Sequence, residues 1–236
     1  MPENNQAVNI ANHIFTSPFL FLTENELVEF NEEKQIGKYK KGDEFITEGT
    51  IPEGVFCILK GTSKLFKNGF NGKEQILRFL KSGDIIGYRS LLCNTKFGAS
   101  AVAMEDMEIS FISKKFFFKI LQNDPKIAYE ILKKIAEDLG EASRTITILA
   151  QKTVRERLAE ILLLLEDKLD VDKDGFINIS LTREEVANLI GTATESAIRL
   201  ISEFKYDQLI EVNGRKIKLL DHKKLKKLAH VTTQTK

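Results

Sequence analysis

The fold of this 236-residue chain is decided near its C-terminal end, where residues 181–204 read LTREEVANLIGTATESAIRLISEF. Thr182 and Glu185 have the spacing of a capping box, which predicts a helix that begins directly after Thr182. Gly191 is expected to end that helix, because glycine adopts a left-handed backbone without a steric penalty. A second amphipathic segment, residues 194–204, follows almost at once. Two short helices joined by a tight turn predict a helix-turn-helix, a motif whose second helix fits the major groove of DNA.

A hairpin is predicted directly after this motif. Residues 209–220 contain Asn213-Gly214 between two apolar runs, and this pair is the strongest signal for a two-residue hairpin turn. The hairpin would form a wing that carries Arg215 and Lys216 at its tip. From Gly191 to the end of the chain, eight Lys and two Arg stand against five acidic residues, a net charge of +5 in a chain whose total is +1. This local positive charge favours binding to nucleic-acid phosphates.

The outer face of the second helix is predicted to read bases. A glutamate can accept a hydrogen bond from cytosine N4, and an arginine can bind guanine O6 and N7 together. The predicted base contacts are Thr194, Glu195, Ile198 and Arg199. The predicted phosphate contacts are Arg183, Ser196, Arg215 and Lys216. An alternative interpretation stays open, in which Glu195 and Arg199 form a surface ion pair along the helix, worth only tenths of a kcal/mol.

The N-terminal half has the pattern of a β structure. Residues 1–34 are predicted to be a short helical preamble in which Thr23 and Glu26 form a capping box. Short β-rich runs then alternate with glycine-containing turns as far as Ile112, which predicts a barrel or roll. The predicted strands are residues 45–46, 55–59, 63–66, 75–80, 85–86, 101–103 and 108–112.

A long amphipathic helix is predicted after Asp124-Pro125, a pair typical of a helix start. Its apolar residues recur every three or four positions over about seven turns, which favours pairing with a second copy of the same helix. The alternative is that the roll covers this stripe. The predicted dimer-interface residues are Ile131, Ile135, Leu139, Ala142, Ile146 and Leu149.

The expected fold class is therefore α+β, in three parts. Residues 1–122 form an all-β barrel or roll. Residues 123–150 form the dimerisation helix, and residues 151–236 form a winged helix-turn-helix domain with a helix from Thr153 to about Asp167 and a short strand at residues 176–179.

Composition argues against several other classes. Two Cys and three scattered His cannot supply a zinc or iron–sulfur site, so no metal and no cofactor are expected. The chain lacks the common catalytic motifs, and we expect it not to be an enzyme. It also lacks an apolar run of about 18 residues and a signal-peptide pattern, so we expect a cytoplasmic protein without a membrane partner.

One acidic turn resembles the start of a calcium-binding loop. Asp170, Asp172 and Asp174 alternate before Gly175, as in an EF-hand. The twelfth position of that loop is Leu181, where a bidentate glutamate is required. We therefore interpret the segment as an acidic turn between a helix and a strand.

These features together resemble the CRP/FNR family of bacterial transcription regulators. The most specific likenesses are residues 181–187, Gly191 and the segment from Thr194 to Arg199. The resemblance implies that residues 1–122 are a double-stranded β-roll of the jelly-roll kind, of the cyclic-nucleotide-binding type, that acts as a sensor domain. It also implies a homodimer that binds double-stranded DNA at a near-palindromic site. It also implies RNA polymerase as a partner, and base contacts by Glu195 and Arg199.

The resemblance does not extend to the cyclic-AMP contacts. Family members that bind cyclic AMP carry a Gly-Glu-Leu segment, where this chain has Tyr88 in place of the glutamate. They also carry an arginine for the cyclic phosphate, and residues 97–101 contain none. A buried phosphodiester without its cation would lose charge-assisted hydrogen bonds. Cyclic AMP is therefore not the expected effector, and the candidate effector pocket consists of Tyr88, Arg89 and Ser100.

Two alternative functions remain open. The chain could be a module that binds a cyclic nucleotide or another small ligand, with weak or ligand-dependent DNA binding. An enzyme on a cupin-like roll is the other, but it needs a clustered His and Glu metal triad that three scattered His do not provide.

Overall fold

The computed structural model describes residues 22–69 and 71–231. The part of the predicted N-terminal helical preamble that precedes residue 22 lies outside the described residues. The chain divides into two compact units. The first unit, the roll, runs up to Lys67 and includes Leu77–Gly140, and the second includes Asn68–Ile76 and the chain from Glu141 onward.

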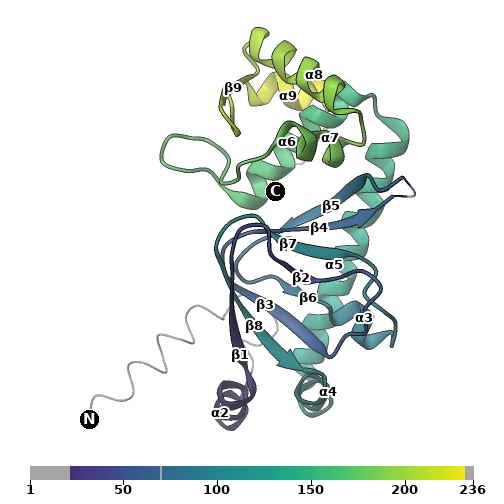
Figure 1. Ribbon diagram of the computed structural model, residues 1–236, viewed down its shortest axis with the longest axis vertical. Helices are drawn as coiled ribbons and strands as arrows, with labels where there is room; N and C mark the ends of the chain where they lie inside the picture. Colours follow the sequence, from purple (N-terminus) through teal and green to yellow (C-terminus); the bar gives the residue numbers. More distant parts are fainter. Residues whose placement is uncertain (1–21, 70, 232–236) are drawn as a thin grey trace. The chain divides into compact units, whose positions relative to one another are not determined.

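Two four-stranded sheets form the roll, and their strand orders are β1-β8-β3-β6 and β2-β7-β4-β5 (Figure 1). The pairings between β1 and β8, β3 and β8, and β4 and β7 are antiparallel. The strands of the first sheet are β1 (Gln35–Tyr39), β3 (Gly54–Lys60), β6 (Ile85–Ile86) and β8 (Met107–Ser113). Those of the second sheet are β2 (Glu44–Ile46), β4 (Ser63–Asn68), β5 (Glu74–Leu80) and β7 (Ser100–Ala103).

Each strand predicted for the roll is present within a residue or two of its expected position. The sequence pattern missed β1, whose residues are mostly exposed and therefore show no run of apolar side chains. Its backbone nevertheless pairs with β8 along its whole length. Strands β3 and β8 lie so close at Gly54 that only glycine fits there, since a Cβ at this position would lie 2.1 Å from the carbonyl oxygen of Ile112.

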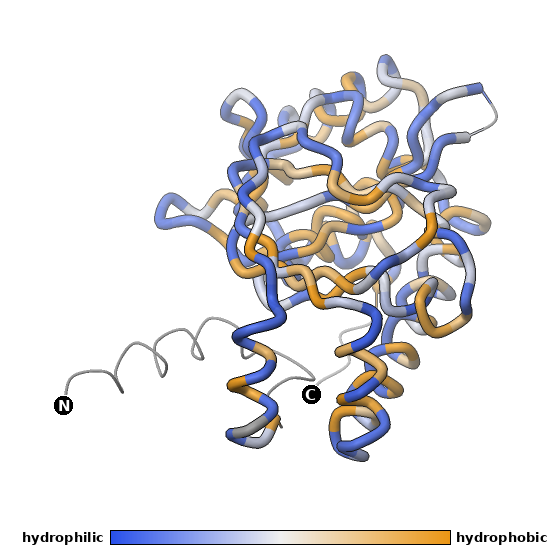
Figure 2. Tube along the Cα trace, turned by 60° about the horizontal axis from the view of Figure 1, so that its bottom comes forward, coloured by the Kyte–Doolittle hydropathy of each residue, from blue (hydrophilic) through white to orange (hydrophobic). Residues whose placement is uncertain are grey.

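The core of the roll extends from the sheets to the helices beside them. Helix α2 (Glu24–Glu33) has the predicted capping box between Thr23 and Glu26, and α4 (Lys114–Asn123) follows β8 directly. Phe30 of α2 and Phe117 of α4 are both buried in one cluster with residues of β3 and β8. The hydrophobic stretches of the strands lie towards the inside of the roll, whereas its outer loops are mostly hydrophilic (Figure 2).

Helix α5 (Pro125–Gln151) begins at the predicted proline, and the Asp124 carboxylate accepts a hydrogen bond of 2.8 Å from the Lys126 N–H. The first turns of α5 belong to the core of the roll, because Ile127 and Ile131 are buried in the same cluster as Phe117. Ile131 is only 3% exposed and does not fit the predicted dimer interface, since its side chain is already packed. In this part of the helix the roll does cover the stripe.

The second unit contains the predicted helix-turn-helix and wing. Helix α6 (Val154–Leu169) precedes α7 (Arg183–Ile190) and α8 (Thr194–Tyr206), and the wing is the antiparallel pair β9 (Ile210–Asn213) and β10 (Lys216–Leu219). A short helix, α9 (His222–Leu228), follows the wing and packs on α6. Thr182 and Glu185 form the predicted capping box, and Gly191 ends α7 with a φ of 66°.

The predicted strand at residues 176–179 is wrong, since only Ile177 pairs there, in an isolated bridge with Val171. A tight turn precedes this bridge, in which the Asp172 carboxylate accepts hydrogen bonds of 3.0 Å from the N–H groups of Asp174 and Phe176. The ladder does not continue because the Ile179 N–H donates back to the carbonyl oxygen of Ile177, over 2.7 Å.

Arg157 of α6 joins the ends of two other helices. Its guanidinium donates to the carbonyl oxygens of Leu149 and Lys152, at the C-terminal end of α5, over 2.8 and 2.9 Å. It also donates to the carbonyl oxygen of Ile190, the last residue of α7, over 3.1 Å. The last carbonyls of a helix lack partners within the helix, so one side chain here satisfies the ends of both α5 and α7.

Candidate nucleic-acid interface

Helix α8 has one buried and one exposed face. Ala197, Leu200, Ile201 and Phe204 are buried in the second unit. Glu195 and Ile198 lie on the exposed side, and the side chain of Arg199 is 75% exposed. Thr194 and Ser196, in the first turn, are partly buried. An exposed edge with a carboxylate, an apolar side chain and a guanidinium can offer an acceptor, a methyl contact and a pair of donors to base edges.

The ion pair that Arg199 makes is with Glu203, at 3.8 Å from Nε to Oε1, and not with Glu195. The alternative interpretation named the wrong partner: Arg199 does form an ion pair along the helix, but with Glu203 and not with Glu195. Both Glu203 and Glu195 lie four positions from Arg199, so sequence spacing alone cannot distinguish them.

Two predicted phosphate contacts are already engaged within the protein. Arg183 Nη2 donates to the carbonyl oxygen of Gly214 in the wing turn over 3.2 Å. Lys216 Nζ lies 2.7 Å from a carboxylate oxygen of Asp172. The hydrogen bond to Asp172 and the charge of that carboxylate raise the pKa of Lys216 above its ordinary value. These contacts fix the wing against α7 and the acidic turn, and a phosphate would compete with the Asp172 carboxylate for Lys216.

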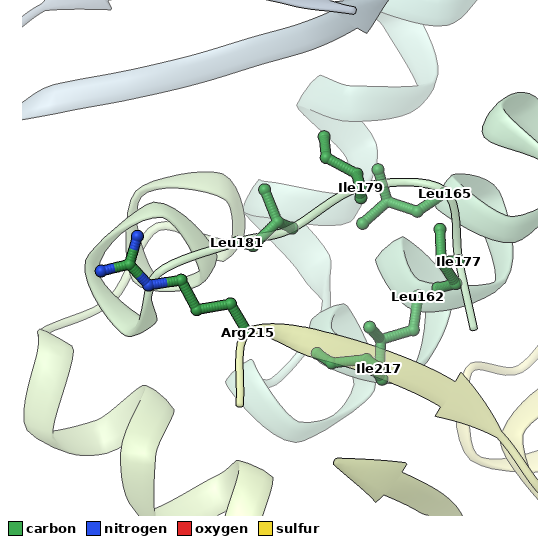
Figure 3. Close-up of a pocket in the computed structure, with 7 residues that line it drawn as sticks. All are labelled: Leu162, Leu165, Ile177, Ile179, Leu181, Arg215 and Ile217. Carbon is green, nitrogen blue, oxygen red and sulfur yellow. The ribbon is translucent and has the colours of Figure 1, made fainter. Parts of the chain in front are cut away.

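Arg215 is more available. It lies at the edge of a small apolar cavity that α6 and the wing enclose, and its guanidinium points away from the hydrophobic side chains there (Figure 3). The other lining residues are Leu162, Leu165, Ile177, Ile179, Leu181 and Ile217. The cavity is too small for a ligand, about 10 Å³, and Arg215 is exposed beside it.

The acidic turn is joined to the wing by two lysines. Besides the pair between Lys216 and Asp172, Lys218 Nζ donates to the carbonyl oxygen of Asp174 over 2.9 Å. In the part of the chain that the structure describes, no group of three or more His, Cys, Asp or Glu side chains is arranged to hold a metal ion.

The roll contains a second, separate cavity of about 80 Å³. Tyr88 of α3 (Tyr88–Leu92) and Arg89 line it, as the sequence predicted, and so do Arg78 of β5 and Asp138 of α5. Ser100 is not among the lining residues: its hydroxyl oxygen accepts from the Glu48 N–H over 2.9 Å. Sequence reasoning missed Arg78 and Asp138 because neither lies in the segments 87–91 and 97–101 from which the pocket was predicted.

Asp138 is paired with one of the two arginines that line this cavity, Arg78. Its carboxylate lies 2.6 Å from Arg78 Nη1 and 3.4 Å from Lys134 Nζ, and it accepts a hydrogen bond from the Tyr88 hydroxyl. Lys134 also lies 3.8 Å from Asp84. Burial alone would raise the pKa of Asp138, but the hydrogen bond and charge of Arg78, with Tyr88 and Lys134, hold that pKa below its ordinary value.

Two family descriptions match this chain in the same order as the two folds. Residues 36–124 match the Cyclic nucleotide-binding domain, and residues 156–228 match the Crp-like helix-turn-helix domain. The chain is 30% identical to the cAMP-activated global transcriptional regulator CRP of Salmonella typhimurium over 185 residues. This matched stretch covers 77% of this chain and 88% of that relative. It is 26% identical over 220 residues to the Fumarate and nitrate reduction regulatory protein of Vibrio cholerae, over 91% of this chain and 87% of that relative.

Solved structures agree with this likeness. A mutant of CooA from Carboxydothermus hydrogenoformans superimposes with a TM-score of 0.69 at 27% identity, over 84% of this chain and 88% of that one. FixK2 from Bradyrhizobium japonicum superimposes with a TM-score of 0.76 at 22% identity, over 85% of this chain and 99% of that one, which shows the shared fold.

The folds and the matches define a regulator with a cyclic-nucleotide-binding-type roll and a Crp-like helix-turn-helix. The chain belongs to the CRP/FNR family of transcription regulators. Its curated relatives are transcription regulators rather than enzymes. None of the helices in the described part of the chain has the length and hydropathy needed to cross a bilayer.

The charges around Asp138 predict a pH-dependent contribution to the stability of the roll. Asp138→Asn should lower the free energy of unfolding at pH 7 by about 1–3 kcal/mol, because Arg78 loses its charged partner. A carboxylate whose pKa is depressed on folding stabilises above its unfolded pKa, about 3.9. The difference from wild type should therefore be complete above that pH and should close as the pH falls through the depressed pKa.

Urea unfolding at pH 7, 5 and 3, followed by circular dichroism, measures this difference. Glu137→Gln, at an exposed neighbouring position of α5, is the matched control. A difference that is the same at all three pH values, or equal in the control, would contradict the assignment.

Proposed function

We propose that this chain is a homodimeric, sequence-specific DNA-binding transcription regulator whose effector is not cyclic AMP. The observation that carries the proposal is the exposed edge of α8, which presents Glu195, Ile198 and Arg199 while the opposite face of the helix is buried. Such an edge can enter a major groove without unpacking the domain. RNA polymerase is the expected second partner, from the family resemblance alone.

Phosphate contacts would place this edge in register. Ser196 lies in the first turn of α8, where backbone N–H groups and the helix dipole favour an anion. Arg215 at the wing tip supplies an exposed cation on a neighbouring element. Arg183 would support binding indirectly, because it holds the wing turn through Gly214.

A second copy of the chain is the proposed partner of α5. Leu132, Leu139 and Ile146 are 62–67% exposed and lie seven residues apart. A seven-residue apolar repeat matches the seam of a two-stranded coiled coil. Of the interface residues that the sequence predicted, Ala142 is also exposed, Ile135 and Leu149 are partly buried, and Ile131 is replaced by Leu132.

The roll cavity supports the exclusion of cyclic AMP. Arg78 and Arg89 are the cations that line it, and Arg78 is paired with Asp138. A cyclic phosphate would have to displace that carboxylate or lie beside it, at an electrostatic cost. The same two arginines are also what favours the alternative function, a module that binds a different small anionic ligand and thereby controls DNA binding.

Base and phosphate contacts predict different mutant phenotypes. Arg199→Ala should cost about 1–3 kcal/mol on a specific site and relax the preference at one base pair, since it removes a bidentate guanine contact. Arg215→Ala should weaken binding to all sequences equally and reduce the salt dependence. Selection from random duplexes, followed by titration of the selected and scrambled duplexes at several salt concentrations, measures both effects.

Equal losses on selected and scrambled duplexes in both mutants would refute this division of roles. A wild-type chain that binds no duplex at low salt would refute the function itself.

The exposed repeat of α5 predicts dimerisation through that helix. Leu139→Glu should shift the protein towards monomer by placing like charges opposite each other in an apolar seam. Glu137→Gln, at an exposed position on the same helix, should remain a dimer. Sedimentation equilibrium of both variants measures the association constant, and a wild-type monomer at micromolar concentration would contradict the prediction.

The ion pair between Arg78 and Asp138 in the roll cavity predicts that cyclic AMP and cyclic GMP give no binding heat at micromolar concentration. Isothermal titration calorimetry of the wild-type protein tests this directly. Micromolar binding of either nucleotide would overturn the interpretation of Tyr88, Arg78 and Asp138.

A further inference from the structure

Arg155 of α6 contacts the C-terminal end of α8. Arg155 Nη1 lies 2.8 Å from Glu203 Oε2, and Arg155 Nη2 lies 2.7 Å from Asp207 Oδ2. Its guanidinium carbon also lies 5.0 Å from the centre of the Phe204 ring, which is buried. Glu203 lies in the last turn of α8 and Asp207 directly follows the helix, so the two carboxylates are one turn apart and a single planar fork holds both.

Glu203 differs from Asp207 in one respect. While its Oε2 is held by Arg155, its Oε1 faces Arg199 Nε at 3.8 Å. One carboxylate therefore connects a guanidinium that is fixed by α6 to a guanidinium on the exposed edge of α8. Asp207, in contrast, lies eight positions after Arg199, and its ion-pair partner is Arg155.

We propose that Glu203 is a positioning residue for Arg199 and thereby helps to determine base specificity. This inference rests on the proposed function. An attraction on the Nε side of Arg199 favours rotamers that leave the two terminal nitrogens free, and these are a pair of donors for guanine O6 and N7. Because Arg155 fixes Glu203, the restraint exists before DNA is bound and reduces the conformational entropy that Arg199 loses on binding.

A purely structural role for Glu203 makes a different prediction. If Glu203 only docks α8 onto α6, then losing it should resemble losing Asp207, since each gives one charge-assisted contact to Arg155. Glu203→Gln and Asp207→Asn each remove one negative charge from the C-terminal end of α8, so their general effects on attraction to phosphates should also match. The pair is thus a matched test of the contact to Arg199.

The experiment measures discrimination at a single base pair. The wild-type half-site is selected from random duplexes, and the base pair at which Arg199→Ala loses discrimination is identified. Dissociation constants are then measured for duplexes with and without the preferred base at that position. Glu203→Gln should reduce the discrimination ratio about fivefold, as expected for a coupled pair, whereas Asp207→Asn should leave it within about twofold. In the Arg199→Ala background, Glu203→Gln should have no further effect on the ratio.

Each outcome decides the inference. Equal discrimination by Glu203→Gln and Asp207→Asn, with both variants folded by circular dichroism, would overturn the positioning role. A loss that persists in the Arg199→Ala background would overturn it as well. A wild-type protein that prefers no sequence would instead overturn the proposed function, which separates the two failures.

Discussion

The geometry of the second unit depends on the guanidinium of Arg157. The end of α5 and the end of α7 each expose backbone carbonyls that no helical N–H can reach. Arg157 donates to both sets from the first turns of α6, so these three helices cannot change their mutual orientation without breaking hydrogen bonds to a charged donor. Because α8 follows α7 after the turn at Gly191, the hydrogen bonds of Arg157 also help to set the direction in which the exposed edge of α8 faces.

Two carboxylates, Glu160, which is buried, and Asp138, which is partly buried, have a similar linking role. Glu160 of α6 is 3% exposed and is paired with Arg144 of α5, at 2.8 Å, and with Lys152, which directly follows α5. Within the roll, Asp138 of α5 is paired with Arg78 of β5. A buried charge that loses its partner is strongly unfavourable. Each of these pairs therefore specifies how a helix lies against its neighbours within its own unit.

The same pairing changes how the basic residues of the C-terminal region are interpreted. Counted along the sequence, Arg183 and Lys216 are equivalent to Arg215 as candidates for phosphate contact. The structure separates them, because Arg183 and Lys216 are joined to Gly214 and Asp172, while Arg215 remains exposed at the wing tip. The acidic turn, interpreted from sequence only as a connection, is one of the elements that holds the wing.

The sequence by itself determined the elements whose signals are local. Capping residues at Thr182 and Glu185, the end of α7 at Gly191 and the wing turn at Asn213-Gly214 all act over a few residues, so their positions were predictable, as were most strands of the roll. Only the tertiary structure decided the features that depend on residues far apart in the chain. Ile131 is buried by the roll, Arg78 meets Asp138 across 60 positions, and Arg199 faces Glu203, which Arg155 holds from another helix. Periodicity identifies which residues share a helix face, but it carries no information about which of several possible neighbours will cover that face.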